Sequence, residues 1–196
     1  MTRKDWIRYP GWLAGRLFGD YKLNRIYQVD LTGFQLRDSR NLDVRRITNL
    51  EDLYRSDDQK MRKSASFGGD QYYGFGLWDD SVLASVCWIY TYEQFKEYLI
   101  WKPEKDEAML VDLVTAEEYW GKGYAPALIE RACLAMREAG FKRLYACIWH
   151  SNYPSIRAFE KAGWTYIAFA VELYPLGIIK KPIHFHRLRR NVRLES

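Results

Sequence analysis

The sequence contains little cysteine and little histidine for its length. Its 196 residues include three of each, namely Cys87, Cys133, Cys147, His150, His184 and His186. Three cysteines are too few for a disulfide framework, and the spacing of these residues matches no common metal-ligand pattern. We therefore expect reduced thiols in apolar surroundings and no bound metal. No cysteine has a neighbouring histidine in the sequence, which argues against a covalent acyl-cysteine intermediate.

Long apolar runs are missing as well. No uninterrupted apolar stretch approaches the ~20 residues that a membrane-spanning helix needs. Near the N-terminus, Pro10, Gly11, Gly15 and Arg16 interrupt the apolar residues, so no signal-peptide core is expected there. With 48% hydrophobic residues and no internal repeat, the chain is long enough for one well-buried core. We expect a cytoplasmic protein without stable membrane insertion.

The excess of positive charge lies at the two ends of the chain. Residues 1–49 carry ten Lys and Arg against five Asp and Glu, and residues 178–196 carry six against one. Residues 50–177 carry 14 against 19, so an acceptor site in this region favours a cationic amine. Basic ends usually face solvent, and we expect no nucleic-acid partner. Polynucleotide binding that weakens steeply with salt is the alternative that they leave open.

The segment Trp120-Gly-Lys-Gly-Tyr-Ala125 directly follows the apolar run Met109–Thr115 and opens a helix. Two glycines separated by one residue let the backbone approach a ligand closely, and the free N–H groups of a helix start favour bound phosphate. The spacing is neither that of a P-loop nor that of a dinucleotide-binding turn. The segment therefore predicts a turn that binds the diphosphate of a nucleotide-like cofactor.

The residues after this turn predict a strand, helix, strand, helix, strand unit. Apolar residues recur at helical spacing from Ala125 to Met136, and Gly140 ends this helix in a left-handed cap. The run Arg143–Trp149 is rich in strand-favouring residues. A second helix follows Asn152 and ends before Gly163.

These residues resemble two linked motifs of the GNAT superfamily of acyl-CoA-dependent N-acyltransferases. The first motif is Arg/Gln-x-x-Gly-x-Gly/Ala, and Gly123 and Ala125 fill its last two places. The second is Asn-x-x-Ser/Ala-x-x-Leu-Tyr-x-x-x-Gly-Phe, whose successive places hold Asn152, Ser155, Ala158, Phe159, Gly163 and Trp164. The close match covers about residues 107–170, and a looser one extends back to about residue 43.

The resemblance implies an α/β (α+β) fold with a central mixed, mostly antiparallel sheet and helices on both faces. We expect this acyltransferase domain at residues 43–196. Residues 1–42 would form an N-terminal extension with a short helix near Pro10 and an added strand over Arg25–Leu31.

Three further elements are predicted at the start of the domain. The first is a strand over Asp43–Thr48, and the second is a helix from about Leu50 to Phe67. The third is a hairpin of residues 72–77 and 81–92, which flank Trp78-Asp-Asp80.

The resemblance also implies the activity, which is transfer of an acetyl or other acyl group from acyl-CoA to an amine without a covalent enzyme intermediate. The acceptor is a small molecule or an amino group of a larger one, and a homodimer is possible. The residues expected to bind acyl-CoA are Leu113, Val114, Thr115, Trp120, Gly121, Lys122, Gly123, Tyr124, Ala125, Asn152, Ser155 and Phe159. The backbone of the first three would hold the pantetheine arm, and Asn152 either contacts this arm or caps the second helix.

Two departures from the family pattern bear on mechanism. Trp120 stands where the family usually has Arg or Gln, so the turn must bind phosphate through backbone amides and Lys122. Phe159 stands where many members have a tyrosine that protonates the departing thiolate. Tyr153, Tyr166 or water could replace this donor. The alternative is a catalytically silent module that binds CoA.

A carboxylate usually accepts the proton of the amine before it attacks the thioester. Asp112 is the candidate base, because a charge within the apolar run Met109–Thr115 needs a partner, a substrate or water. Several family members carry their base one residue earlier, at the position of Val111, so Asp112 faces the other way unless the strand bulges. A purely structural pairing of Asp112 stays open, and Glu107 is a weaker candidate.

Overall fold

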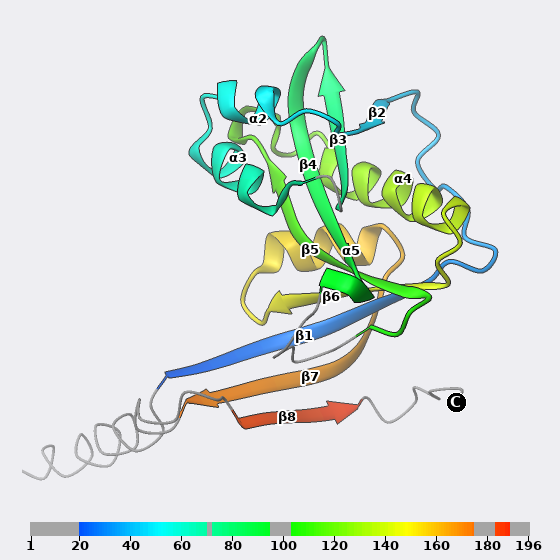
Figure 1. Ribbon diagram of the computed structural model, residues 1–196, viewed down its shortest axis with the longest axis vertical. Helices are drawn as coiled ribbons and strands as arrows, with labels where there is room; N and C mark the ends of the chain where they lie inside the picture. The colour runs from blue at the N-terminus through cyan, green and yellow to red at the C-terminus, as the bar shows by residue number, and fades with distance from the viewer. Residues whose placement is uncertain (1–19, 70–71, 95–102, 175–182, 189–196) are drawn as a thin grey trace, which may run out of the picture.

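A computed structural model describes residues 20–69, 72–94, 103–174 and 183–188 of the chain (Figure 1). One mixed sheet runs through the molecule in the order β2-β3-β4-β5-β6-β1-β7-β8. Its strands are β1 Asp20–Asp30, β2 Asp43–Arg46, β3 Tyr73–Asp79, β4 Val82–Thr91, β5 Glu107–Thr115, β6 Arg143–Trp149, β7 Thr165–Tyr174 and β8 Ile183–Leu188. The helices are α2 Glu51–Arg55, α3 Gln59–Ser64, α4 Tyr124–Glu138 and α5 Tyr153–Lys161, with short 3-10 turns η1 Ala65–Phe67, η2 Tyr92–Gln94 and η3 Glu117–Tyr119.

Neighbouring strands in the described sheet are antiparallel, with one exception. Strands β5 and β6 are parallel and pair only where Glu107–Met109 face Arg143–Tyr145. Both strands continue beyond these pairs without bonding to each other, and Figure 1 shows them diverging. The sheet is therefore open between the later halves of β5 and β6.

Helices cover both faces of the sheet, as predicted. On one face, α4 and α5 pack onto the main core through buried residues such as Leu128, Met136 and Phe159. On the other face, α2 and α3 contribute Leu53 and Met61 to a second cluster. The mixed, mostly antiparallel sheet and its two helical layers confirm the predicted fold class. The strand, helix, strand, helix, strand unit is also confirmed as β5 to β7.

The described part of the N-terminal segment forms an inner strand of the sheet. Strand β1 pairs with β6 on one side and β7 on the other, and Ile26 and Tyr27 are fully buried. The predicted strand over Arg25–Leu31 is thus a longer strand that begins at Asp20. The helix predicted near Pro10 lies outside the described residues, and the domain boundary at residue 42 stays a prediction.

The single helix predicted from about Leu50 to Phe67 is wrong, because the segment forms α2, α3 and η1. Ser56 is extended (ψ 139°) and ends α2. The Asp58 side chain then accepts hydrogen bonds from the amides of Lys60 and Met61 and begins α3. A short acidic side chain satisfies free helix-start amides better than it sits within a helix, so Asp58 starts a new helix.

The predicted hairpin is present as β3 and β4, but its turn lies later than expected. Asp80 and Ser81 form the turn with φ values of +47° and +72°. Two consecutive left-handed residues give a turn whose twist matches that of the flanking strands. Trp78 and Asp79 therefore remain in β3.

Helix α4 ends as the sequence predicts. Gly140 follows its last residues with a φ of +93°, and the amide of Phe141 bonds back to the carbonyl of Met136. This left-handed cap positions β6 to enter the sheet beside β5. Within the described residues, no helix combines the length and apolar character that crossing a membrane requires.

Candidate functional site

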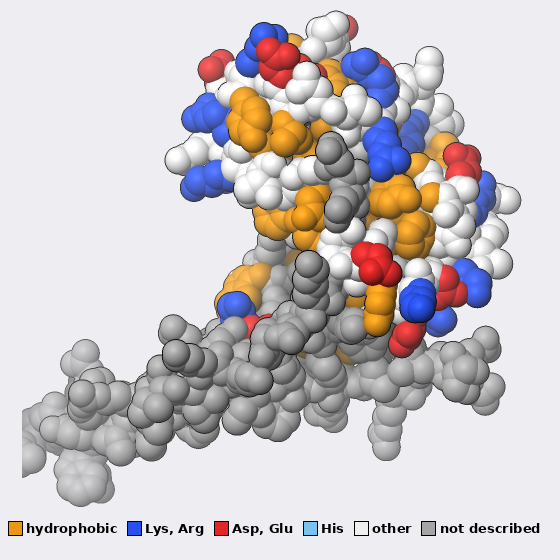
Figure 2. Space-filling model, in the orientation of Figure 1, with side chains coloured by type: hydrophobic (Ala, Val, Ile, Leu, Met, Phe, Trp, Pro, Cys, Tyr) orange, Lys and Arg blue, Asp and Glu red, His pale blue; other side chains and the backbone are white. Residues whose placement is uncertain are grey.

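A cavity of about 150 Å³ lies where β5 and β6 separate. It is lined by Leu110, Val111, Asp112, Leu113, Ala146, Cys147, Ile148, Trp149, Asn152, Ser155 and Phe159. Figure 2 shows the molecule hollowed on the side toward which β6 runs, below the layer of α2 and α3. The cavity brings together five predicted site residues from β5, from α5 and from the N-cap of α5, namely Asp112, Leu113, Asn152, Ser155 and Phe159. Val114, Thr115 and the phosphate turn lie outside its lining.

Strand β5 bulges at Val111. Trp88 of β4 faces Asp112, whereas the next residue, Ile89, faces Leu110, so Val111 has no partner across the ladder. A bulge redirects the side chains that follow it. This is the irregularity that the sequence left open for Asp112, and Asp112 accordingly borders the cavity.

Asp112 is half-buried and tied to the opposite helical layer. Its Oδ2 accepts a hydrogen bond from Ser64 Oγ of α3 at 2.5 Å, and Ser64 Oγ accepts one from Trp88 Nε1 at 3.0 Å. Burial raises the pKa of Asp112, while hydrogen bonds from Ser64 and from the Leu113 backbone oppose that rise. A carboxylate with a raised pKa next to a cavity is suited to accept a proton.

Glu107, the weaker candidate base, is engaged in the fold. Its carboxylate forms an ion pair with Arg143 at 2.9 Å and accepts hydrogen bonds from Tyr145 Oη at 3.0 Å and the Glu104 amide at 2.9 Å. It is 4% exposed and does not line the cavity. These contacts indicate a structural role at the start of β5.

The predicted phosphate turn has the geometry of an anion-binding loop. Gly121 and Gly123 have φ values of +80° and +76°, and α4 begins at Tyr124. Among the described residues, nothing accepts a hydrogen bond from the amides of Gly121, Gly123, Tyr124 or Ala125. These amides and the positive end of the helix dipole can bind a diphosphate.

Trp120 holds the turn against the end of β5. Its indole Nε1 donates a hydrogen bond to the carbonyl oxygen of Thr115 at 2.8 Å, while the side chain is 59% exposed. Lys60 Nζ lies 5.0 Å from the centre of the ring. The indole thus shapes the turn but gives it no charge.

Arg40 is a contact of this turn that the sequence reading missed. Its Nη1 donates to the carbonyl of Lys122 at 3.0 Å, and its Nη2 donates to that of Gly123 at 3.2 Å. The same guanidinium pairs with Asp38 at 2.6 Å, which lowers the pKa of Asp38 to about 2. No local pattern links residue 40 to residue 123, so only the folded chain reveals this contact.

A buried carboxylate on α4 fixes the loop that carries Arg40. Glu130 is 3% exposed and accepts hydrogen bonds from the amides of Arg37 and Asp38 at 2.8 and 3.0 Å. Arg131, which follows Glu130 on α4, donates a hydrogen bond to the carbonyl of Arg40. The loop is therefore held along α4 at the place where Arg40 meets the turn.

Neither of the two predicted tyrosine donors lines the cavity. Tyr153 is the first residue of α5 and is 57% exposed, and Tyr166 packs its ring against Tyr27 at 5.8 Å. Phe159 is buried in the cavity wall, edge-on to Trp164. No described tyrosine lines the cavity, whereas the hydroxyl-bearing Ser155 does.

Asn152 has the helix-capping role that the sequence allowed. Its side-chain oxygen accepts a hydrogen bond from the Ser155 amide at 3.3 Å at the start of α5. The side chain also borders the cavity. Capping uses only the oxygen, so the amide group remains a donor for a bound ligand.

The three cysteines are free thiols, and their surroundings keep them protonated. Burial raises the pKa of Cys147 to about 12 and also raises the pKa values of Cys87 and Cys133. A thiol of this kind is a poor nucleophile at neutral pH. Within the described ranges, no group of three metal-ligating side chains comes together.

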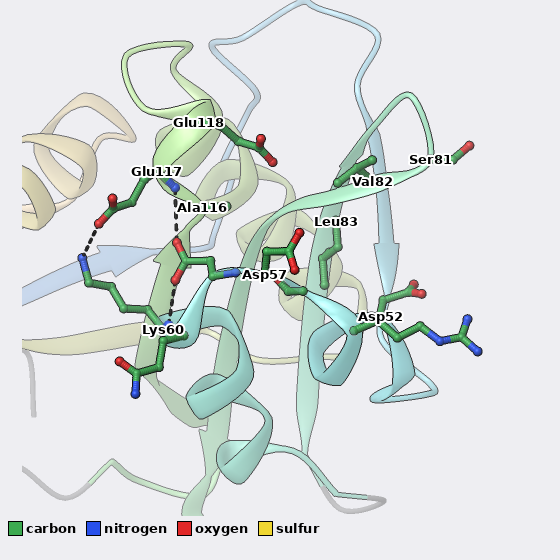
Figure 3. Close-up of a pocket in the computed structure, with 13 residues that line it drawn as sticks. Asp52, Asp57, Lys60, Ser81, Val82, Leu83, Ala116, Glu117 and Glu118 are labelled. Atoms are coloured by element: carbon green, nitrogen blue, oxygen red, sulfur yellow. Dashed lines mark hydrogen bonds and ion pairs between the residues drawn. The ribbon is translucent and has the colours of Figure 1, made fainter.

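A separate acidic pocket of about 660 Å³ lies on the side of the sheet covered by α2 and α3 (Figure 3). Five carboxylates line it, on Asp52, Asp57, Asp58, Glu117 and Glu118. Part of this charge is already engaged, because Lys60 pairs with Glu117 at 3.2 Å and Asp58 caps α3. Part of the excess negative charge of residues 50–177 therefore gathers in this pocket.

A comparison with protein families identifies the chain. The model of the acetyltransferase (GNAT) family matches residues 36–164, which is more than half of the sequence. The chain belongs to this family. The resemblance drawn from the two motifs is therefore confirmed, and acyl-CoA is the co-substrate that the GNAT family uses. No curated protein matches the chain significantly.

Solved structures share the fold at low sequence identity. A GNAT-family acetyltransferase from Colwellia psychrerythraea aligns with 85% of this chain and 61% of its own, at 14% identity and a TM-score of 0.57. A tandem GNAT protein from the clavulanic acid biosynthesis pathway aligns with 84% of this chain and 58% of its own, at 13% identity and a TM-score of 0.52.

The GCN5-related glucosamine N-acetyltransferase region of a fungal multi-domain GH3 β-N-acetylglucosaminidase aligns with 95% of this chain and 23% of its own. Identity is 11% and the TM-score is 0.58. At such identities the likeness shows the fold alone. The chain spans about three fifths of the Colwellia chain and under a quarter of the fungal chain.

Proposed function

We propose that the protein is an N-acyltransferase that transfers an acetyl or other acyl group from acyl-CoA directly to an amine. One observation carries this proposal. The cavity between β5 and β6 combines a half-buried carboxylate, Asp112, with the motif residues Asn152, Ser155 and Phe159. The residues proposed to bind the cofactor and to accept the proton thus border one space.

In the proposed reaction, Asp112 accepts a proton from the bound ammonium group, directly or through water. The neutral amine attacks the thioester carbonyl, forming the C–N bond and a tetrahedral intermediate. Backbone amides of β5 stabilise the oxyanion. The C–S bond then breaks, the amide product forms, and the CoA thiolate takes up a proton. That proton is the second one lost by the amine nitrogen, and it passes from the intermediate to the thiolate directly or through water.

The cofactor would lie along β5 and reach the start of α4. Amides of residues 121–125 bind the diphosphate, with Lys122 nearby. The backbone of Leu113–Thr115 holds pantetheine, and the side-chain amide of Asn152 donates to it. The excess of acidic residues in the central part of the sequence, residues 50–177, supports a cationic acceptor.

A catalytically silent CoA-binding module is the second candidate. The absence of a tyrosine from the described cavity lining, where Phe159 replaces the family donor, favours this alternative. Both proposals predict CoA binding, and only the first predicts turnover.

The test is to supply acetyl-CoA with a panel of amines, including polyamines, amino sugars and peptide amino groups, and to measure released CoA thiol. Release that depends on one class of amine supports the transferase. Calorimetric binding of acetyl-CoA without release on any amine supports the silent module. Failure to bind CoA would contradict both. A cytoplasmic location and a homodimer remain predictions.

A further inference from the structure

The indole of Trp88, on β4, is tightly packed by the residues around it. The side chain is 1% exposed. A Cβ atom at Gly74 would come within 2.2 Å of Cζ3 of the indole, and one at Gly68 within 2.8 Å of its Cη2. No real Cβ makes such contacts, so glycine at both positions leaves the room that the ring needs. The orientation of the indole N–H is consequently fixed.

The hydrogen bonds that start at this N–H run in one direction. An indole Nε1 only donates, so Ser64 Oγ is the acceptor at 3.0 Å. The single hydroxyl proton of Ser64 then points to Oδ2 of Asp112 at 2.5 Å. Ser64 is 2% exposed, so water does not compete for these bonds.

We propose that Trp88 and Ser64 are positioning residues that hold Asp112 as a proton acceptor at the cavity. Because the Ser64 hydroxyl must donate its proton to Asp112, this series of hydrogen bonds favours the form of Asp112 in which Oδ2 is unprotonated. The second carboxylate oxygen is left to take the proton of the amine. The catalytic part of this inference rests on the proposed transferase function, whereas the effect on the carboxyl group does not.

Three described titratable groups near Asp112, namely Cys87, Tyr90 and Cys147, are neutral at pH 7. On β4, burial raises the pKa values of Tyr90 and of the Cys87 thiol, and both groups lie within electrostatic reach of Asp112. On β6, Cys147 lines the same cavity with a pKa of about 12. No described charged side chain contributes to the raised pKa of Asp112. Among side chains, Ser64 is therefore the one that lowers the pKa of Asp112 most.

The experiment is a carboxyl titration by NMR of protein labelled with ¹³C at the aspartate side chains. Asp112→Asn assigns the Asp112 signal. We expect Ser64→Ala to raise the pKa of Asp112 by about 1, because a donor to the ionised form is lost. Trp88→Phe should raise it by less, since Ser64 stays but is free to turn.

Ser85→Ala is the matched control. Ser85 is a buried serine of β4 whose hydroxyl bonds to the Val114 carbonyl and to Thr115, not to Asp112. It should leave the titration of Asp112 unchanged. Ser64→Thr keeps the donor and should restore the wild-type value. An unchanged pKa in Ser64→Ala would overturn the inference.

A second measurement tests whether the hydrogen bonds from Trp88 through Ser64 to Asp112 affect catalysis. With an amine that the enzyme accepts, the acid limb of the pH profile of kcat/KM should shift to higher pH in Ser64→Ala. The shift should equal the rise in the pKa of Asp112 that the NMR titration measures. If Ser64→Ala fails to fold, Ser64→Cys, a weak donor of similar size, should give an intermediate rise. A titration that moves while no amine is acetylated would reject the proposed function and leave the hydrogen-bond chain standing.

Discussion

The phosphate turn and the surroundings of Asp112 are built in different ways. The turn consists of six consecutive residues, 120–125, and presents backbone amides. The carboxylate depends on a bulge in β5, a serine on α3 and an indole on β4. The proposed diphosphate site is therefore built mainly from neighbouring residues, with Arg40 as a distant contact, whereas the proposed chemistry depends entirely on contacts between distant parts of the chain.

This difference predicts that the two regions can be disabled separately. The largest effect is expected from Asp112→Asn, which should lower kcat by at least about a hundredfold because the general base is lost. The dissociation constant of acetyl-CoA, measured by calorimetry, should change less than about twofold. An Asp112→Asn enzyme with near wild-type kcat would remove Asp112 from the mechanism.

The same variant gives a prediction on stability. Burial raises the pKa of Asp112 in the folded state, so this carboxyl stabilises the fold when protonated, and that contribution is lost as the pH rises through its folded pKa. Asparagine does not titrate. The melting temperature of Asp112→Asn relative to wild type should therefore increase from pH 4 to pH 7. A constant difference would contradict the raised pKa.

The turn is best disturbed by Gly123→Ala. The left-handed backbone costs a residue with a Cβ roughly 1–2 kcal/mol, and the new Cβ would lie 3.3 Å from Arg40 Nη2. We expect acetyl-CoA to bind about thirtyfold more weakly, with kcat at saturation nearly unchanged. Gly33→Ala is the control, because Gly33 has a similar φ of +71° but no atom near its Cβ position. Equal losses in both variants would point to general destabilisation.

Arg40→Gln should have a smaller effect on the same region. Loss of the bonds to the Lys122 and Gly123 carbonyls leaves the turn less ordered, and CoA affinity should fall about fivefold, as expected for charge-assisted hydrogen bonds. Arg45→Gln is a matched control, since Arg45 pairs with Asp43 as Arg40 does with Asp38. If both variants bind CoA equally well, Arg40 does not shape the turn.

The smallest effect is expected from Tyr153→Phe. The side chain is largely exposed and does not line the cavity, so kcat should change less than about twofold. A loss of tenfold or more in the released-thiol assay would identify Tyr153 as the proton donor after all.

Local patterns predicted the parts of the fold that depend on neighbouring residues. The helix cap at Gly140 and the bounds of β6 are examples, because helical spacing and strand-favouring residues are local properties. The break between α2 and α3 was missed although Asp58 carries a capping signal and residues 55–60 are all polar.

The missed site contacts have a different cause. Ser64, Trp88 and Asp112 lie far apart in the sequence, as do Arg40 and Gly123. Nothing in the residues around Arg40 marks it as a partner of the turn. Only strand register and helix packing bring such side chains together, so a single sequence contains no periodicity or spacing that predicts them.

A crystal structure with acetyl-CoA bound would test the proposed site most directly. We expect the diphosphate on the amides of residues 121–125 and the thioester in the cavity between β5 and β6, with Asp112 facing it. A thioester outside that cavity, or an Asp112 carboxylate turned away from the sulfur, would show that the proposed site is wrong.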